Sequence, residues 1–364
     1  MTDTEDGSPE PPATTTSDDA APQAQRPIGF LAELHDAVSP RTVALVFGVL
    51  LLQLAFILSY VGAFHSPKPH RITVAVVAPA AASAQLVDRV NSLSGSPLKA
   101  HAVDTAAQAR RQVSTGSASA ALIVNGAGTS DQLLVSSGGG SSVVTAVEQV
   151  ATAVETAQHR TVTTTDLVPL QSGDSRGLTG FYLVIGWIVG GYLVSALLGI
   201  TAGSRPATPR RAVIRLLSLV PYAILSGVFG ALIVDQVLGA LTGHFVALWW
   251  LGALVVLGTA TVTMAFQILL GVLGIGVTVL VFVVLGNPSA GGAYQPALLP
   301  PFWRAISGAL PNGAATDTVR RIVYFGGHGI GTHLLVLCLY AVAGVVATLG
   351  ASVLIHRRAP ASPD

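Results

Sequence analysis

The sequence predicts a polytopic α-helical membrane protein with six transmembrane helices. An α/β extracytoplasmic domain is inserted between the first and second helices, and a re-entrant helical hairpin precedes the sixth. Of the 364 residues, 51% are hydrophobic and only 10% are charged, which is typical of a chain whose main solvent is the bilayer. Several apolar runs reach the length of about 20 residues that a spanning helix needs. Strand and helix patterns alternate between residues 65 and 177, which indicates the separate domain.

The N-terminal region comes before the first span. Residues 1–26 are rich in Asp, Glu, Pro and Thr and have few large apolar side chains, so we expect a disordered cytoplasmic tail. Apolar residues at helical spacing predict an interfacial elbow helix over 27–42, for which an unstructured lead-in is the alternative. Residues 43–64 form the first predicted span. Because about forty residues precede it without a clear cleavage site, we expect a retained anchor.

The segment 65–177 contains β-rich runs at Ile72–Pro79 and Ala120–Val124, with helical patterns between and after them. This alternation predicts a small α/β domain with a mostly parallel sheet. The single cysteine, Cys338, lies in the last apolar run, so a hydrophobic core must stabilise the domain. The glycine run Gly138–Gly140 precedes a long helical pattern and is either an anion-binding helix start or a flexible joint. The flexible joint is the simpler interpretation, because no basic residue or G-x-G-x-x-G pattern accompanies the run.

The membrane domain, residues 178–355, contains five further predicted spans. They cover residues 178–202, 216–241, 245–270, 272–286 and 334–355. In the first of them, Gly186 and Gly190 have the spacing that lets helix backbones approach closely. The strongest positive-inside signal is in the loop after this span, with Arg205, Arg210, Arg211 and Arg215. This loop and the tail 356–364 are therefore expected in the cytoplasm, together with both termini.

Between the last two spans, residues 287–332 are too polar to cross the membrane as a helix. Asn287-Pro288 is expected to stop the preceding helix, since proline lacks an N–H donor. Pro300-Pro301 then predicts the start of a short helix, Phe302–Leu310. Pro311-Asn312-Gly313 is expected to break that helix, and a second one is predicted over Ala314–Phe325. Two short helices between spans predict a re-entrant hairpin.

This order of Asn-Pro, a glycine-rich stretch, Leu-Pro-Pro-Phe-Trp, a short helix, Leu-Pro and a helix ending Arg-Arg-Ile-Val-Tyr resembles the re-entrant segment of ABC-2 type exporter permeases. The likeness is greater to their phage-infection-protein (Pip)-like branch, which has a large extracytoplasmic domain after the first span. It covers roughly residues 43–354. The resemblance implies a permease subunit that works as a homo- or heterodimer in the cytoplasmic membrane, is driven by a separate ATPase and exports a lipid-like or amphipathic compound.

The resemblance also implies roles for particular residues. The loop with Arg205, Arg210, Arg211 and Arg215 would contact the ATPase, although positive-inside orientation alone also explains these arginines. The transport pathway and its outer gate would include Gly186, Gly190, Asp235, Pro300, Pro301, Phe302, Trp303 and Arg304. An alternative is a non-transporting cell-surface protein whose extracytoplasmic domain acts as a receptor or envelope scaffold.

Asp235 is the carboxylate that lies well inside a predicted span, near its outer end. An unpaired carboxylate in lipid costs several kcal/mol, so such a residue is a functional candidate by default. Because Asp235 lies near the end of the span, a structural role is the simpler interpretation, in which it contacts interfacial water or pairs with Arg304. A role in cargo or proton movement is the alternative.

Other chemistry finds little support in the sequence. No Walker A or H-E-x-x-H pattern occurs, so we expect no enzyme activity and no cofactor. His244, His328 and His333 are all expected near the outer face and could bind zinc, but no Asp, Glu or Cys is fixed beside them, so we expect no metal. A net charge of +1 argues against a nucleic-acid partner and leaves membrane lipids as the surroundings.

Overall fold

The computed structural model describes residues 40–201, 203 and 208–358. The predictions for the tail 1–26, most of the elbow helix and Arg205 lie outside the described residues. The chain divides into two compact units, residues 1–50 and 51–364, and the boundary falls inside helix α2 (Pro40–Phe64). The second unit contains both the α/β domain and the helical bundle.

The α/β domain is built on a five-stranded sheet. Its strands are β1 (Ile72–Val77), β2 (Leu98–Ala102), β3 (Ala120–Ile123), β4 (Ser130–Val135) and β5 (Thr161–Asp166), in the order β2-β1-β3-β4-β5. The pairs β1–β2, β1–β3 and β4–β5 are parallel and β3–β4 is antiparallel, which confirms the mostly parallel sheet. The strands β2, β4 and β5 had not been predicted from the sequence.

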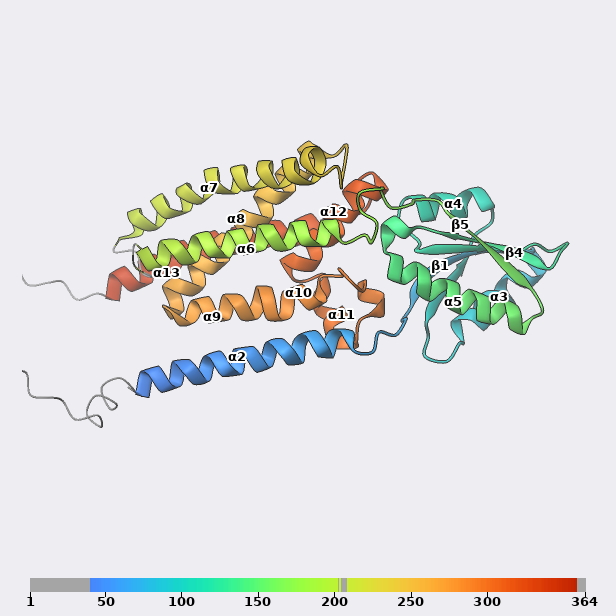
Figure 1. Cartoon of the computed structure of the whole chain (residues 1–364), viewed down its shortest axis with the longest axis horizontal. Coiled ribbons are helices and arrows are strands. Elements are labelled where there is room, and N and C mark those ends of the chain that lie inside the picture. The colour runs from blue at the N-terminus through green and yellow to red at the C-terminus, as the bar shows by residue number, and fades with distance from the viewer. Residues whose placement is uncertain (1–39, 202, 204–207, 359–364) are drawn as a thin grey trace, which may run out of the picture. The chain divides into compact units, whose positions relative to one another are not determined.

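Helices cover both faces of this sheet (Figure 1). Helices α3 (Ala80–Asn91) and α5 (Ser141–Ala157) pack on one face, where Val74 and Leu133 are buried beneath them. Helix α4 (Ala106–Ser114) packs on the other face, over Ala75 and Leu134. Residues one apart in each strand therefore enter two different cores, as the alternation of side chains along a strand requires.

Five described helices are long and apolar enough to cross a membrane, which indicates a membrane-embedded protein. They are α2, α6 (Thr179–Thr201), α7 (Pro209–Leu232, continued by π-helix η2, Ile233–Val237), α8 (Phe245–Leu270) and α13 (Gly331–Arg358). Helix α8 is the centre of the bundle and contacts α6, α7 and α13 (Figure 1). In its most apolar window 67% of the residues are buried, against 6% in α2. Burial on all sides explains why α8 is apolar all round.

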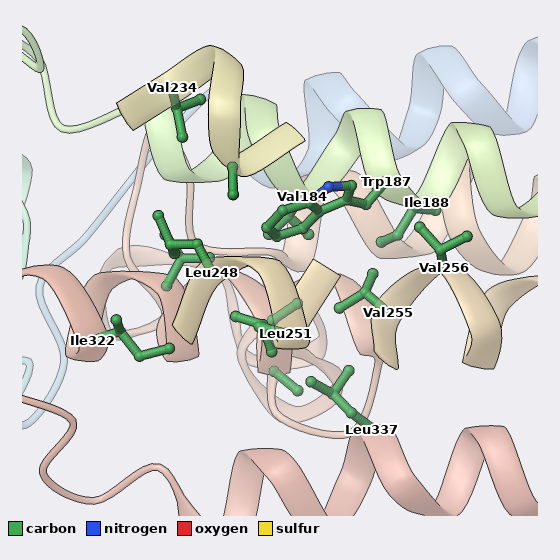
Figure 2. Packing of buried hydrophobic residues seen from close by; sticks show 14 of the residues in the cluster. Val184, Trp187, Ile188, Val234, Leu248, Leu251, Val255, Val256, Ile322 and Leu337 are labelled. Atoms are coloured by element: carbon green, nitrogen blue, oxygen red, sulfur yellow. The ribbon is translucent and has the colours of Figure 1, made fainter. Parts of the chain in front are cut away.

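A cluster of buried apolar residues joins these helices (Figure 2). Trp187 of α6 lies at its centre, and its indole Nε1–H donates to the Ser226 carbonyl of α7 at 3.3 Å. Gly252 of α8 makes room for the ring, because a Cβ there would lie 2.6 Å from Trp187 Cζ2. A glycine in the middle of a spanning helix thus marks a close helix contact.

The predicted span over 272–286 is a shorter and irregular helix. Helix α9 (Leu273–Val279), π-helix η3 (Leu280–Leu285) and α10 (Gly286–Ser289) form one apolar segment, Leu273–Ser289. At about 1.5 Å per residue its 17 residues reach about 25 Å, less than the hydrocarbon thickness of about 30 Å. The described residues therefore contain five helices of full spanning length, and the span predicted over 272–286 is shorter than that.

Pro288 does not stop this helix where expected. The chain stays helical to Ser289, and the carbonyl of Val284, four residues before Pro288, accepts a hydrogen bond from the Ser59 hydroxyl of α2. That hydroxyl replaces the N–H that proline lacks, which is how proline is tolerated inside membrane helices.

The predicted hairpin contains 3₁₀-helix η4 (Pro296–Leu298), α11 (Pro301–Ser307) and α12 (Pro311–Phe325). One expectation was wrong: Pro311-Asn312-Gly313 does not separate two helices but forms the first turn of α12. Pro311 occupies the first helical position, where the absent N–H costs nothing, and Leu310 precedes it in an extended conformation. Gly313 is required because a Cβ there would lie 2.7 Å from the Ser307 carbonyl carbon.

Candidate functional site

The predicted gate residues lie in different parts of the bundle. In α6, a Cβ on Gly186 would meet nothing within 4 Å, whereas Gly190 accepts a hydrogen bond from Tyr222. The closest backbone approach in this helix is at Gly191, where a Cβ would lie 2.8 Å from the Val256 carbonyl oxygen. The glycine spacing thus predicted a close helix contact at Gly190, but the closest backbone contact is at Gly191, one residue further along the helix.

Asp235 lies in π-helix η2 and is buried, with 7% of its surface exposed. Its Oδ1 accepts the backbone N–H of Gly243 at 3.3 Å. Within the described part of the chain no ion pair joins Asp235 to Arg304. The structure therefore gives Asp235 a contact with the loop between α7 and α8 in place of the expected arginine.

Residues Pro300 to Arg304 form the start of α11. Pro300 precedes the helix and Pro301 is in its first turn, while Phe302 is 55% exposed. The indole nitrogen of Trp303 lies 3.9 Å from the Cβ position of Gly62 in α2. Arg304 has its Nη1 buried without a hydrogen-bond partner. A planar cation with an open donor at this position is available for an anionic group or ordered water.

The arginines of the predicted ATPase contact lie around the start of α7. The hydroxyl of Thr208 caps the helix by accepting the Arg211 N–H at 3.3 Å, and Arg215 donates to the Gly203 carbonyl at 2.8 Å. Arg210 lies in the first turn, and Arg205 is outside the described residues. Next to them Val213 and Ile214 are 43% and 64% exposed, so the start of α7 has an apolar surface beside its positive charge.

The three histidines do not gather around a common point. His244 precedes α8, His328 Nδ1 contacts the Phe325 carbonyl at 2.6 Å, and His333 Nε2 contacts Asp317 at 3.0 Å. Among the described residues no group of three or more His, Cys, Asp or Glu side chains could hold a metal ion.

Helix α12 connects the bundle with the α/β domain. It contacts α6, α8, α10 and α13 as well as the turn that precedes α5, and most of its residues are buried (Figure 1). At its first turn, Asn312 Nδ2 donates to the Phe282 carbonyl at 2.9 Å and to Asn287 Oδ1 at 2.7 Å. The start of α12 is therefore bound to the irregular helix α9–α10.

At its other end α12 packs against the glycines of the α/β domain. A Cβ on Gly138 would lie 2.6 Å from Tyr324 Cδ1, and one on Gly116 would lie 3.1 Å from the Phe325 ring. Gly140 adopts φ +138° and lies against the Gln295 side chain, which also accepts a hydrogen bond from Ser142. The glycine run was expected to be a flexible joint, but it is a close-packed surface that only residues without a side chain allow.

A charged cluster, here called the base-rich cluster, consists of Asp317, Arg320 and Arg321 of α12 with His333 of α13. Arg321 Nε donates to Asp317 at 2.6 Å, and Arg320 Nη1 lies 3.6 Å from the same carboxylate. Burial alone would raise the pKa of Asp317, but the His333 hydrogen bond and the two arginine charges outweigh it, so this pKa lies below its usual range.

One hydrogen bond joins the α/β domain directly to α12. The Tyr324 hydroxyl donates to Asp174 Oδ2 at 2.7 Å, and the other oxygen of Asp174 accepts the Thr179 N–H at the start of α6. Burial, followed by the Asp174 carboxylate, raises the pKa of Tyr324. Asp174 thus fixes the linker between the domain and the second span onto α12.

A second group, here called the acid-rich cluster, lies in the α/β domain, beyond the carboxyl ends of β1 and β3. Arg160 Nε donates to Asp131 at 2.7 Å and lies 3.5 Å from Glu155, and both carboxylates are buried. Burial, with the neighbouring Asp131, raises the pKa of Glu155 to about 7. A cavity of about 160 Å³ is lined by these three side chains together with Arg89 and Gln158.

Sequence reasoning named Arg320 and Arg321 only as members of a helix and missed Asp174, Asp317 and Tyr324. The one available signal was the charge density of the helix, with Asp317 three and four residues before the arginines. Comparison with known protein families, with curated proteins and with solved structures found no match for this chain.

Proposed function

We propose that the chain is the membrane subunit of an ABC-2-like exporter that moves a lipid-like or amphipathic compound, with α11 and α12 as its outer gate. The observation that supports this most is the irregular helix α9–α10 followed by buried helices α11 and α12. Interrupted helices in membrane transporters occur where backbone lines a cavity or pathway, because lipid cannot satisfy free backbone groups.

The path of the chain supports a sixth crossing by the short segment Leu273–Ser289. The segment starts directly after the end of α8 and reaches α12, which in turn contacts the first turn of α13. Helices α8 and α13 run parallel, because Gly258 lies beside Leu337 and Thr261 lies beside Gly344, so the segment connects the end of α8 with the opposite end of the neighbouring α13. A segment a few ångströms too short is accommodated by local thinning of the bilayer at modest cost. In this arrangement both termini and the loop before α7 lie in the cytoplasm, and the α/β domain lies outside.

The outer gate is proposed to move together with the α/β domain. Tyr324, Phe325 and Gln295 pack against domain glycines, so a displacement of α12 requires a displacement of the domain. At its other end, Asn312 bonds the irregular helix. This arrangement favours a gate whose opening reorganises both the membrane segment and the exported domain. Cargo would pass between two copies of the chain, as the resemblance implies.

The ATPase contact is proposed at the start of α7. A variant that keeps the positive charge but changes the surface tests whether this region binds an ATPase or only orients the chain in the membrane. Replacing Arg210 and Arg211 by lysine retains positive-inside orientation but removes bidentate guanidinium geometry. Changing Val213 and Ile214 to alanine in the same variant removes the exposed apolar surface. The variant should insert normally, lose co-purification of an ATPase and lose export-linked phenotypes.

A matched control keeps Arg210 and Arg211 and changes Leu217 and Val220 to alanine, since these residues are also exposed but lie further along α7. The control should keep the ATPase. If the first variant keeps both the ATPase and the phenotypes, the arginines only orient the chain and the exporter proposal loses its coupling site.

A receptor or scaffold role for the α/β domain is the second candidate, and the acid-rich cluster favours it. The cluster lines a cavity beyond the carboxyl ends of parallel strands, which is where α/β sheets commonly bind ligands. Loss of ATPase coupling at Arg210 and Arg211 would leave such a role intact. An ATPase encoded beside this chain would favour transport, and the absence of an associated ATPase would favour the receptor.

A further inference from the structure

A cavity of about 190 Å³ lies between the α/β domain and α12. Its walls come from segments far apart in the sequence: the turn after α4, the turn before α5, the stretch before α11, and α12 itself. The polar side chains that line it are those of Ser119, Ser136, Gln295, Asp317, Arg320 and Arg321. This volume is enough for one tetrahedral or carboxylate group with part of its hydration.

Positive charge predominates on these walls. Of the charged side chains that line the cavity, two are arginines and one is a carboxylate. Arg320 is only 9% exposed, donates one hydrogen bond to the Gly291 carbonyl at 2.8 Å and lies 3.6 Å from Asp317. A guanidinium has five N–H donors, more than these two contacts use.

A serine hydroxyl provides an independent sign of a missing partner. Ser136 is 3% exposed and lines the cavity, and its Oγ has no hydrogen-bond partner among the described residues. A buried hydroxyl without a partner costs about 1–3 kcal/mol, so such groups in folded proteins normally face water or a ligand. Ser136 and Arg320 line the same cavity.

We propose that this cavity binds one anionic group, a phosphate or a carboxylate, held by Arg320, Arg321 and the Ser136 hydroxyl. Guanidinium groups recognise phosphates and carboxylates by paired N–H donors, and a hydroxyl adds a third directed donor. The charge of the nearby Asp174 also acts on Arg320, while both Asp174 oxygens already accept hydrogen bonds, from Tyr324 and from the Thr179 N–H.

The group could belong to a membrane lipid, to an amphipathic cargo or to free phosphate. Where it belongs to cargo, the inference rests on the proposed export function and assigns it an anionic substrate class. An anion bound there would contact both α12 and the α/β domain, and would thus strengthen the contact between the proposed gate helix and the domain.

The test uses the full chain purified in a neutral detergent, with unfolding followed by tryptophan fluorescence on heating. The probes are inorganic phosphate at constant ionic strength, dioctanoyl phosphatidic acid, and zwitterionic dioctanoyl phosphatidylcholine as the comparison lipid. A ligand that binds only the folded chain raises its unfolding midpoint as its concentration rises. We expect phosphatidic acid to raise the midpoint more than phosphatidylcholine does. A rise with inorganic phosphate as well would identify the phosphate group alone as the ligand, whereas a rise with phosphatidic acid alone would identify a lipid.

Ser136→Ala is the main variant, because it removes an unpartnered hydroxyl and should not impair folding. It should weaken the apparent affinity about tenfold, the loss expected for one hydrogen bond to a charged group. Ser141→Ala is the matched control: its hydroxyl is also buried without a partner but does not line the cavity. Arg320→Lys keeps the charge and should weaken binding further by removing the paired donors.

Equal midpoints with phosphatidic acid and phosphatidylcholine, together with no effect of inorganic phosphate, would overturn the proposal. Equal affinities in Ser136→Ala and Ser141→Ala would also overturn it. Neither measurement involves an ATPase or transport. Failure of anion binding therefore leaves the exporter proposal standing, and loss of ATPase coupling leaves the anion site standing.

Discussion

The two charged clusters have opposite charge surpluses. The acid-rich cluster places Asp131 and Glu155 around a single arginine, whereas the base-rich cluster places Asp317 between two arginines and a histidine. In the first, burial and Asp131 raise the pKa of Glu155 to about 7. In the second, the cations hold the pKa of Asp317 below its usual range.

Because of this difference in charge, the acid-rich cluster can bind a proton, whereas the base-rich cluster can bind an anion. The acid-rich cluster has one carboxylate more than its arginine can neutralise, so a proton is bound near neutral pH. The base-rich cluster has a surplus cation and lines a cavity, so the missing partner there is negative. Each cluster is incomplete without a small charged partner, and the charges of its side chains determine the sign of that partner.

The largest effect is expected from Arg160→Gln in the acid-rich cluster. It leaves Asp131, whose side chain is 1% exposed, with the Asn125 N–H but without its cation. Because Asp131 stays buried without its cation, we expect the largest loss of unfolding free energy among the variants. Urea-dependent proteolysis of the full chain in detergent measures the loss. Arg89→Gln, which changes an exposed arginine on the same cavity, should cost within about 0.5 kcal/mol. Equal losses in the two variants would show that Arg160 does not hold the cluster together.

A smaller effect is expected from Asp317→Asn in the base-rich cluster. It removes the carboxylate shared by Arg320, Arg321 and His333, but 30% of that side chain reaches solvent, so water compensates in part. We expect a loss of about 2 kcal/mol in the same proteolysis assay, smaller than the loss in Arg160→Gln. Asp104→Asn, at an exposed carboxylate, is the control and should be nearly neutral. A loss larger than that of Arg160→Gln would reverse the comparison.

A third prediction concerns the pH dependence of the acid-rich cluster. The pKa of Glu155 is about 7 in the folded chain and near 4.5 ordinarily, so the folded chain holds this proton more tightly than the unfolded chain. Stability should therefore fall as pH rises from about 4.5 through 7. Glu155→Gln cannot titrate and should remove this slope, and at pH 8 it should be more stable than the wild type by about 3 kcal/mol. An unchanged slope in the variant would place the proton elsewhere.

The smallest effect is expected from Tyr324→Phe, which removes the hydrogen bond between α12 and Asp174. One such bond to a charged acceptor contributes about 1–2 kcal/mol. Hydrogen exchange of the linker around Asp174 should increase, because its second oxygen would still hold Thr179 but the first would lose its partner. Tyr182→Phe, at a tyrosine that is 62% exposed, should leave exchange unchanged. No difference between the variants would mean that packing alone joins the domain to α12.

The apolar elements could be predicted from the sequence. Long hydrophobic runs predicted the five full-length helices, and the apolar strands β1 and β3 were recognised from composition. Strand β2 was missed because Lys99 and His101 interrupt its apolar pattern, and β5 because it is largely threonine at the edge of the sheet. Edge strands bury little, so their sequences carry little hydrophobic signal.

The site could not be predicted because its contacts are not local. Tyr324 and Asp174 are 150 residues apart, and Ser142 and Gln295 are 153 apart. The same limit explains Pro288: the sequence shows the missing N–H, but only the fold supplies the Ser59 hydroxyl that replaces it. The glycine run was interpreted as flexible because the rings that fill its space come from the opposite end of the chain.

The close packing of domain glycines against Tyr324 and Phe325 also has a mechanical meaning. Two loops, residues 65–71 and 167–178, tether the domain covalently, and loops yield easily to tension. On the domain side of this contact the glycines have no side chain that could bend, so the contact transmits force with little deformation. From α12 the load passes to α13 through Asp317 and His333. A force applied to the α/β domain would thus reach the apolar helix α13 through this contact.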